Sequence, residues 1–531
     1  MLDYLGIQYK KKNAVIKWII EHQNEDGSWG AIAERSKGNY RNTLISSEAL
    51  KMYMSSKHLE KAENWIKTYQ GNKWLDPYTQ MFLSIKRKDI EIFSPPLFIN
   101  SVPLKICKSF GKLHVNFPSI FSWSIFLYPS GWTRNALPPL QIIANLKKKS
   151  RLGFIKKYLL KRLEDRLLKT QLKNGSWFDT ALPTMGTIYA LHELGYRNND
   201  VRIVKALKFL DELTDTNGHL NRFRLTVWDT SLAIMAFRES DISDSDIKNC
   251  VKFILRAQTK KGGWAFGMYN QNLPDNDDTA LATLALRKIS GNVQIKGMEG
   301  AILRGIKYLL TMQNDDGGWG AFDKNQSYKK PGRIPPYHEE YGHELKDPST
   351  ADVTAHVLQT LGENKVYNSE KIIKKATRWL KRDQLSFGGW WGRWGLCYIY
   401  GTTQVLSSLS TIGEDMNKSY VKNAIDWLID IQNDDGGWGE HYSSYYSEKP
   451  IIAESTVEQT SWVLISLMEC GIDDPKIIEK GMDFLLEKQK GDGSFPKAYT
   501  AAAAIDPGRY DLYSLVFPLI ALSKYKKRCK I

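Results

Sequence analysis

The chain has 531 residues, of which 42% are hydrophobic and 25% are charged, a composition typical of globular proteins and unlike that of disordered or fibrous chains. Its 74 Lys and Arg residues outnumber its 58 Asp and Glu residues, so the net charge is +16, which favours anionic partners such as a membrane surface. No stretch is long and apolar enough to predict a transmembrane helix, and the N-terminus lacks the apolar core of a signal peptide.

One seven-residue pattern, Gln-x-x-x-Gly-(Gly/Ser)-(Trp/Phe), recurs along the chain. Its copies begin at Gln23, Gln171, Gln258, Gln313, Gln384, Gln432 and Gln489. Each copy follows apolar residues at helical spacing, as in AIDWLIDIQNDDGGW, and its glycine is suited to ending a helix. The pattern predicts an all-α fold of helix–turn–helix hairpins arranged in α/α barrels, with few strands. The turns themselves are interpreted as scaffold, with the tryptophan stacked over the turn and the glutamine amide capping backbone groups.

A basic amphipathic helix is predicted around Phe154 to Lys169. Its apolar face consists of Phe154, Ile155, Leu159, Leu163 and Leu167, while Lys156, Lys157, Lys161 and Arg162 lie elsewhere around the helix. This distribution suits an anionic bilayer surface. It suits equally well a solvated helix that packs on its own domain.

Residues 275–278 read DNDD and place three carboxylates, those of Asp275, Asp277 and Asp278, before an alanine- and leucine-rich helix. One aspartate is enough to cap a helix N-terminus. Three crowd like charges together, so at least one should hold a proton more readily than a free aspartate. A carboxyl that holds a proton near aromatic side chains suits general-acid catalysis. The segment is therefore interpreted either as a helix cap or as the acid of an enzyme.

Metal binding is the rival interpretation, because aspartate-rich motifs can hold Mg²⁺. The chain has no second aspartate cluster of similar density, and HEEYGH at 338–343 lacks the spacing of a helical zinc site. The five cysteines are widely spaced without a Cys-x-x-Cys pair, which argues against disulfides and a cysteine-rich zinc site. Phosphate-binding glycine motifs and nucleic-acid-reading motifs are absent from the sequence. We therefore expect no metal ion, no cofactor and no nucleic-acid partner.

Taken together, the motifs resemble those of the squalene–hopene cyclase family and its relatives that act on sesquarterpenes. The resemblance is carried by the repeated turns, VWDTSLA at 227–233, DNDDTA at 275–280, DPSTADVTAHVL at 347–358 and GRWGLCYIYGT at 392–402. It implies two α/α-barrel (α/α toroid) domains with a large apolar cavity between them. The implied organisation is a segment at 1–20 that packs on the second barrel, a first barrel at 21–214 with a membrane-associated part at 120–170, and a second barrel at 215–531.

Carried over position by position, the resemblance also implies the site. Asp277 would protonate a terminal alkene, and His356 would hydrogen-bond the other oxygen of this acid and raise its acidity. The implied catalytic residues are Asp275, Asp277, Asp278, Asp352 and His356. The implied substrate-binding aromatics are Trp132, Trp228, Phe266, Phe322, Trp394, Tyr400, Tyr510 and Tyr513, of which Tyr400 would also support the network around the acid. Aromatic faces stabilise cations without reacting with them, each by roughly 0.5–2 kcal/mol.

The resemblance predicts an isomerase (intramolecular transferase) that cyclises a linear polyprene, either a triterpene or a sesquarterpene. We expect the protein in the cytoplasm, peripheral to the inner face of the cell membrane and bound to anionic lipid, and a homodimer is left open. Two alternatives remain: a cyclase of a shorter prenyl diphosphate that retains the diphosphate, and a barrel that is non-catalytic or prenylates proteins. Ala501 to Ala504 stand where the family has large aromatics, which predicts a wider cavity and fewer rings in the product.

Overall fold

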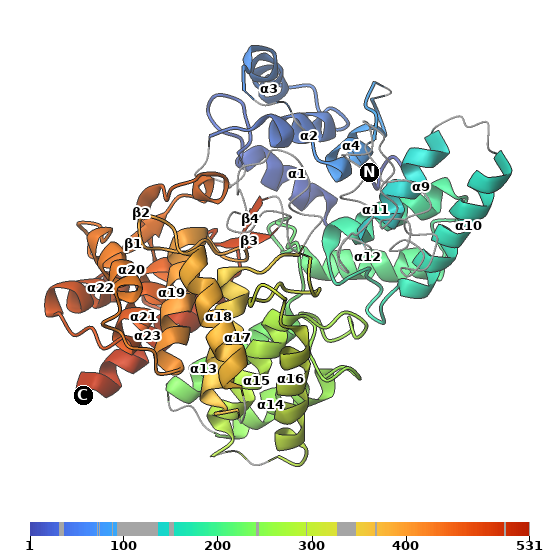
Figure 1. Ribbon diagram of the computed structural model, residues 1–531. Coiled ribbons are helices and arrows are strands. Elements are labelled where there is room, and N and C mark those ends of the chain that lie inside the picture. Colours follow the sequence, from blue (N-terminus) through green and yellow to red (C-terminus); the bar gives the residue numbers. More distant parts are fainter. Residues whose placement is uncertain are drawn as a thin grey trace, which may run out of the picture. The chain divides into compact units, whose positions relative to one another are not determined.

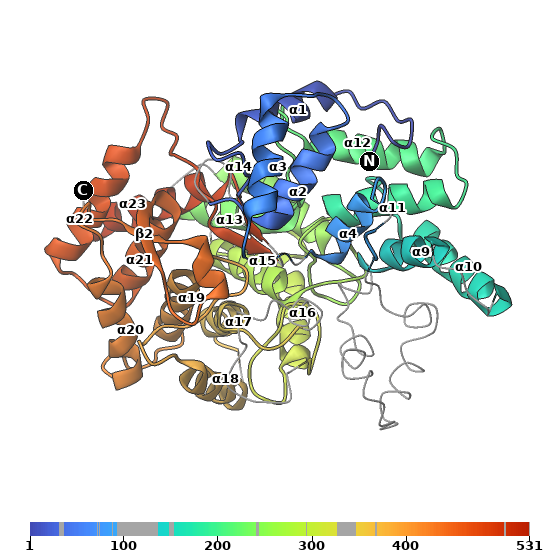
Figure 2. The same cartoon turned by 90° about the horizontal axis from the view of Figure 1, so that it is seen from above.

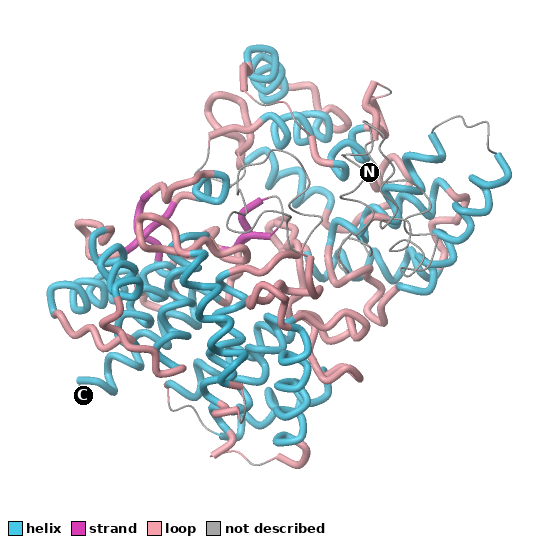
Figure 3. Tube along the Cα trace, in the orientation of Figure 1, coloured by secondary structure: helices cyan, strands magenta, loops and turns pink. Residues whose placement is uncertain are grey.

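The computed structural model describes residues 1–30, 37–71, 73, 75–87, 89–92, 136–147, 153–240, 244–291, 293, 295–326, 347–366, 369–503 and 506–529. Trp132, predicted to line the cavity, and Ala504 lie outside these residues. Figure 3 shows that helices are the main regular elements of the chain and that its described strands are short. The predicted all-α class is therefore confirmed.

The chain forms two compact units, residues 1–224 and 225–531 (Figure 1). The helices of the first unit are α1 (Lys12–Glu21), α2 (Tyr40–Leu50), α3 (Lys57–Thr68), α4 (Pro77–Leu83), α9 (Pro138–Lys147), α10 (Gly153–Thr170), α11 (Ala181–Glu193) and α12 (Val201–Leu213). Contacts run from α2 to α4, from α4 to α9 and from α9 to α11, while α3, α10 and α12 pack on α2, α9 and α11 respectively. This is the alternation of inner and outer helices expected for α/α hairpins.

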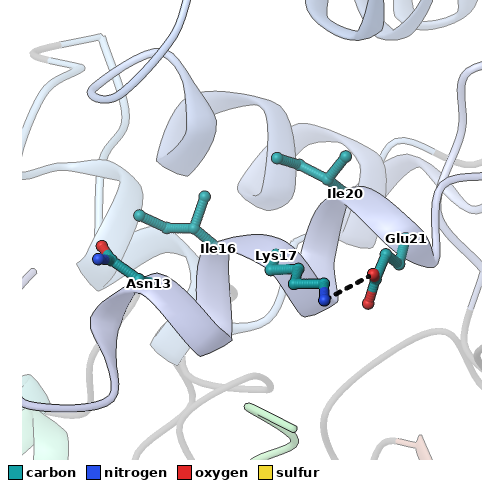
Figure 4. Close-up of a pocket in the computed structure, with 5 residues that line it drawn as sticks. All are labelled: Asn13, Ile16, Lys17, Ile20 and Glu21. Carbon is teal, nitrogen blue, oxygen red and sulfur yellow. Dashed lines mark ion pairs between the residues drawn. The ribbon is translucent and has the colours of Figure 1, made fainter.

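The N-terminal residues are tied to the end of α12 within the first unit. The hydroxyl of Tyr9 lies 2.6 Å from that of Thr214 and also donates to the carbonyl oxygen of Leu210. A pocket of about 390 Å³ opens along α1 and is lined by Asn13, Ile16, Lys17, Ile20 and Glu21 (Figure 4). Its two charged side chains form an ion pair of 3.5 Å. None of the predicted site residues lines this pocket, so the site is described from the second unit.

The second unit is a closed α/α barrel. Its inner helices are α13 (Thr226–Glu239), α15 (Asn276–Ile289), α17 (Ala351–Glu363), α19 (Cys397–Thr411), α21 (Val457–Glu469) and α23 (Tyr513–Cys529). Each contacts the next, and α23 returns to α13, which closes the ring. The outer helices are α14 (Asp244–Ala257), α16 (Met298–Met312), α18 (Glu370–Asp383), α20 (Ser419–Asp430) and α22 (Pro475–Lys488). Figure 2 shows α17, α19 and α21 side by side in this ring, in agreement with their contacts.

The repeated turn joins each outer helix to the following inner helix. Its hydrogen bonds explain why the same residue types recur in every copy. In the fourth copy the Gln313 amide donates to the carbonyl oxygens of Gly317 and Ile372, at 2.8 and 3.0 Å. The indole of Trp319 donates to the carbonyl oxygen of Leu309 at 2.9 Å, back along α16. Gly317 has a φ of 112°, a backbone conformation that side chains with a Cβ rarely adopt. The turn therefore fastens α16 to α18, and the predicted capping role of the glutamine amide is confirmed.

The described strands are short and lie in two antiparallel pairs. Strand β1 (Trp438–Glu440) pairs with β2 (Ile452–Thr456), and β3 (Ala501–Ala503) pairs with β4 (Asp506–Gly508). An isolated bridge joins Gly395 to Ala501, which brings the start of β3 next to the loop before α19. The side chain of Ala501 is fully buried, whereas only the backbone of Ala502 and Ala503 is described.

Candidate active site

The DNDD segment begins α15, and only one of its carboxylates caps the helix. Asp275 is the N-cap residue, and its Oδ1 accepts the backbone N–H of Asp278 at 2.7 Å. The side-chain amide of Asn276 donates to the carbonyl oxygen of Gly320 at 2.7 Å, which ties α15 to the turn after α16. The helix start is thus held without the side chain of Asp277, and the simple cap interpretation accounts for Asp275 alone.

Asp277 instead joins a buried chain of three polar side chains. Its Oδ1 lies 2.6 Å from Nδ1 of His356, and Nε2 of the same imidazole lies 2.9 Å from Oε1 of Gln404. The Asp277 and His356 side chains are only 9% and 8% exposed. The three residues come from the consecutive inner helices α15, α17 and α19. Both imidazole nitrogens are therefore engaged, one by a carboxyl and the other by an amide oxygen.

Burial and neighbouring charge act on this group in opposite directions. Burial lowers the pKa of His356, but the charge and hydrogen bond of Asp277, helped by Asp352 and Gln404, raise the pKa above its ordinary value overall. Burial raises the pKa of Asp275 to about 8, and the charge of Asp277 adds to that effect. Burial also raises the pKa of Asp278 well above its usual range, together with the charge of Asp275. The cluster therefore favours a histidine that is protonated and two flanking carboxyls that keep their protons at neutral pH.

Two further buried carboxylates hold loops that carry aromatic side chains. Oδ2 of Asp352 accepts the backbone N–H groups of Arg393 and Trp394, at 2.8 and 2.9 Å. Asp347 accepts three backbone N–H groups in the same manner, among them that of Phe322 at 2.5 Å. The rings of Phe322 and Trp394 then meet edge to face, with centroids 6.1 Å apart. Asp352 thus acts on His356 by charge, while its hydrogen bonds position the loop before α19.

Aromatic side chains also lie beside the imidazole of His356. The rings of Trp228 and Tyr400 lie 5.9 and 6.3 Å from that of His356. The Trp228 indole donates to the hydroxyl oxygen of Tyr513 at 2.9 Å, and the ring of Tyr510 lies 5.1 Å from the ring of Tyr513. Aromatic faces from α13, α19 and α23 therefore gather beside the Asp277–His356 pair.

Most of the predicted site residues come together, and a few are placed differently. The carbonyl oxygen of Phe266 accepts the backbone N–H of Val227, next to Trp228, at 3.0 Å. Ala501 belongs to the same buried cluster as Trp228, Tyr400 and Tyr513.

Three residues in this region were not singled out from the sequence. Gln404 lies four positions after Tyr400, on the same face of α19, and this spacing was the available signal. Asp347 opens the DPSTADVTAH segment, but nothing in its sequence context showed that it would bind the 321–323 loop. Trp462 of α21 packs at 4.9 Å from the ring of Tyr400, and its indole N–H is buried with no partner among the described residues.

Across the described part of the chain, no three His, Cys, Asp or Glu side chains are grouped in a way that could hold a metal ion. In the same residues, no helix is long and apolar enough to cross a membrane. The chemistry that the described groups support is proton transfer by a buried carboxyl in aromatic surroundings.

Family models match both units. The model described as "Squalene-hopene cyclase C-terminal domain" matches residues 225–527, and that described as "Prenyltransferase alpha-alpha toroid domain" matches residues 2–73. The matched C-terminal region contains all described residues of the candidate site.

Several curated relatives carry related names. Squalene–hopene cyclase of Alicyclobacillus acidocaldarius is 29% identical over 96% of this chain and 89% of that enzyme. Sporulenol synthase of Bacillus subtilis is 34% identical over 70% of this chain and 59% of that enzyme. Squalene–hopene cyclase of Bradyrhizobium diazoefficiens is 34% identical over 56% of this chain, and this match spans 48%, about half, of the relative.

A solved structure shares the fold. ent-Copalyl diphosphate synthase from Streptomyces platensis superposes with a TM-score of 0.60 at 15% identity, covering 98% of this chain and 93% of that one. At this identity the likeness concerns the fold alone.

Proposed function

This chain belongs to the squalene–hopene cyclase family, and from that premise we propose that it is a terpene cyclase that protonates a terminal alkene of a linear polyprene and guides its cationic cyclisation. The observation that carries the proposal is the buried pair of Asp277 and His356, 2.6 Å apart, with aromatic rings beside it. An alkene is a very weak base, so its protonation needs an acid that is both strong and shielded from water.

The proposed first step moves one proton. Asp277 gives the proton on its Oδ2 to the terminal alkene, where a new C–H bond forms and the adjacent carbon becomes a tertiary cation. The carboxylate that remains is stabilised by the imidazolium of His356, which donates from Nδ1 to Oδ1. Each following ring closure consumes one alkene and moves the cation along the chain. Loss of a proton from the last cation completes an isomerisation.

The aromatic residues are proposed to stabilise the moving cation. Trp228 and Tyr400 lie beside His356 and would act near the first ring, with Tyr513 fixed by its hydrogen bond to Trp228. Phe322 and Trp394 form a second aromatic pair that buried carboxylates hold in place. Each face contributes roughly 0.5–2 kcal/mol of cation stabilisation, enough to direct partitioning between competing products.

Products of the purified full chain test the substrate class. The enzyme would be incubated with squalene, a longer linear polyprene and geranylgeranyl diphosphate in one mixture, and the products would be analysed by mass spectrometry. We expect cyclic isomers of squalene or of the longer polyprene, because the family relatives are named for such reactions. Turnover of geranylgeranyl diphosphate alone, with the diphosphate retained, would contradict the proposed substrate and favour a diterpene-type cyclase.

We also propose that α10 attaches the protein to an anionic bilayer surface. Leu163 and Leu167 are buried in the core of the first unit, where α10 packs on α9. The N-terminal half of the same helix turns apolar side chains outward, with Phe154 85% and Ile155 51% exposed. Basic residues such as Lys157 lie next to them. An exposed apolar end with flanking lysines suits insertion at the boundary between lipid headgroups and acyl chains.

Flotation with vesicles tests this attachment. The double variant Phe154→Ser and Ile155→Ser should lose most binding to phosphatidylglycerol-containing vesicles, and Lys156→Glu with Lys157→Glu should lose the part that falls with added salt. The matched control replaces Val201 and Val204 by Ser, since these α12 side chains are 62% and 50% exposed in the same unit. Equal flotation of all variants would show that α10 does not carry the attachment.

A further inference from the structure

The geometry of the buried chain Asp277–His356–Gln404 indicates which nitrogens of the imidazole carry a hydrogen. Oε1 of Gln404 lies 2.9 Å from Nε2 of His356. An amide oxygen can only accept a hydrogen bond, so Nε2 must carry a hydrogen. Whether Nδ1 also carries a hydrogen then determines how the proton is shared between His356 and Asp277. If the imidazole is neutral, Nδ1 accepts a hydrogen bond from the carboxyl O–H of Asp277; if it is an imidazolium, Nδ1 donates a hydrogen bond to Oδ1 of Asp277.

Only the second arrangement directs a proton away from the imidazole. In the neutral case the carboxyl proton lies on Oδ1, between Asp277 and His356, and points at the ring. In the imidazolium case Oδ1 accepts from Nδ1, and the carboxyl proton sits on Oδ2. The oxygen that faces away from the imidazole can then give its proton to an alkene. An acceptor at Nε2 favours this state, because the imidazolium has two N–H groups that must both be satisfied when buried.

Other charged and titratable groups near His356 also influence its protonation. Asp277 faces it from α15, Asp352 acts from its own helix α17, and Tyr400 faces it from α19. Helix α13 contributes the uncharged ring of Trp228. The outer helices α16 and α18 also pack on α17. Burial raises the pKa of Asp383 on α18 to about 7, and the charges of Asp316 and Asp352 add to that effect; burial likewise raises the pKa of Tyr308 on α16, and the charge of Asp275 adds to it. Within the described ranges of the chain, the side chains that hydrogen-bond the imidazole are those of Asp277 and Gln404.

We propose that Gln404 is a positioning residue whose amide oxygen holds a proton on Nε2 of His356 and thereby keeps the imidazolium aligned on Asp277. This inference rests on the proposed cyclase function and adds a residue to it. Gln404 is half-buried and reaches the acid only through the imidazole. It should therefore change how the active state depends on pH and leave the binding of substrate unchanged.

The test uses two substitutions of opposite electrostatic effect. Gln404→Met keeps the length of the side chain but removes the strong acceptor, whereas Gln404→Glu keeps an oxygen near Nε2 and adds negative charge. Loss of the acceptor lowers the pKa of the imidazolium, so the fall in kcat at high pH should move to lower pH by about one unit. The Glu variant should move this fall to higher pH. In Gln404→Met, kcat near neutral pH should drop about tenfold with KM unchanged.

Controls separate this role from a structural one. Ser408→Ala is the matched control, because that buried hydroxyl of α19 donates only within its own helix, to the carbonyl oxygen of Val405. In a His356→Ala background, Gln404→Met should have no further effect on the pH profile. A uniform loss of activity with an unshifted profile, or full activity of both Gln404 variants, would overturn the inference. If Asp277→Asn kept wild-type activity, the proposed function itself would fail; an inactive Asp277→Asn with unshifted Gln404 variants would refute this inference alone.

Discussion

Replacing Asp277 by Asn should abolish cyclisation and leave the fold unchanged. The amide oxygen of Asn can still accept the hydrogen bond from Nδ1 of His356, so the buried pair keeps its geometry. The amide cannot supply the proton that opens the reaction, and in the part of the chain that the structure describes no carboxyl other than that of Asp277 has a hydrogen bond to this imidazole. Loss of a general acid costs a factor of at least about 10² in rate. The measurement is product formation by mass spectrometry over hours, beside circular dichroism and thermal unfolding.

The matched control for this substitution is Asp474→Asn. Asp474 is also an aspartate at a helix N-terminus, where its side chain accepts the backbone N–H of Lys476 at 2.9 Å in the same unit. It therefore reports the effect of changing a capping carboxylate far from the candidate acid. Turnover of Asp277→Asn within tenfold of the wild type, with unfolding unchanged, would rule out Asp277 as the proton donor.

The barrel of the second unit could be predicted because one local pattern repeats. In each copy the glutamine, the glycine and the aromatic residue have separate structural roles. Each role depends on contacts within the turn or with an adjacent helix. The φ of 112° at Gly317 and the indole bond of Trp319 to Leu309 are local consequences of the sequence. The ring closure from α23 to α13 was not visible in the same way, since no repeat encodes which helices finally meet.

The sequence could indicate which residue is the acid but not which residues hydrogen-bond to it. The sequence of the DNDD segment shows that three carboxylates are crowded together. In the structure Asp275 caps the helix, whereas Asp277 pairs with His356. That pairing joins residues 79 positions apart, so only the family resemblance could suggest it beforehand. The resemblance also implies Asp352 in this network; its charge helps to raise the pKa of His356, while its hydrogen bonds run to the loop of Arg393 and Trp394.

The site residues that the sequence does not predict are those whose role depends on a partner distant along the chain. Asp347 binds the backbone of residues 321–323, and Gln404 binds an imidazole on another helix. Amides and carboxylates in such positions look like ordinary polar residues in the sequence. Spacing could have drawn attention to Gln404, because it shares a face of α19 with Tyr400.

Replacing His356 by Ala should have the second largest effect, lowering the cyclisation rate by about 10- to 100-fold and removing a pH dependence of stability. Burial lowers the pKa of His356, but Asp277 and its other neighbours raise it overall above the ordinary value of 6.5. A histidine with a raised pKa stabilises the fold fully below pH 6.5, and that stabilisation is lost as the pH rises through the raised value. The wild type should therefore lose its advantage in thermal unfolding over His356→Ala as the pH rises above 6.5.

Comparing the two proteins at each pH is essential, because other buried groups titrate in the same range. Burial raises the pKa of Asp275 to about 8 and that of Asp229 to about 7. Such carboxyls bind protons more tightly in the folded state, so they too make stability fall as the pH rises. Their contribution is present in both proteins and cancels in the difference between the two unfolding curves. What remains belongs to the imidazole of His356 and its hydrogen bond with the carboxyl of Asp277. A difference that stayed constant from pH 5 to 9, within about 0.3 kcal/mol, would mean that the pKa of His356 is the same in the folded and the unfolded protein, and the proposed pairing of the imidazolium with Asp277 would be refuted.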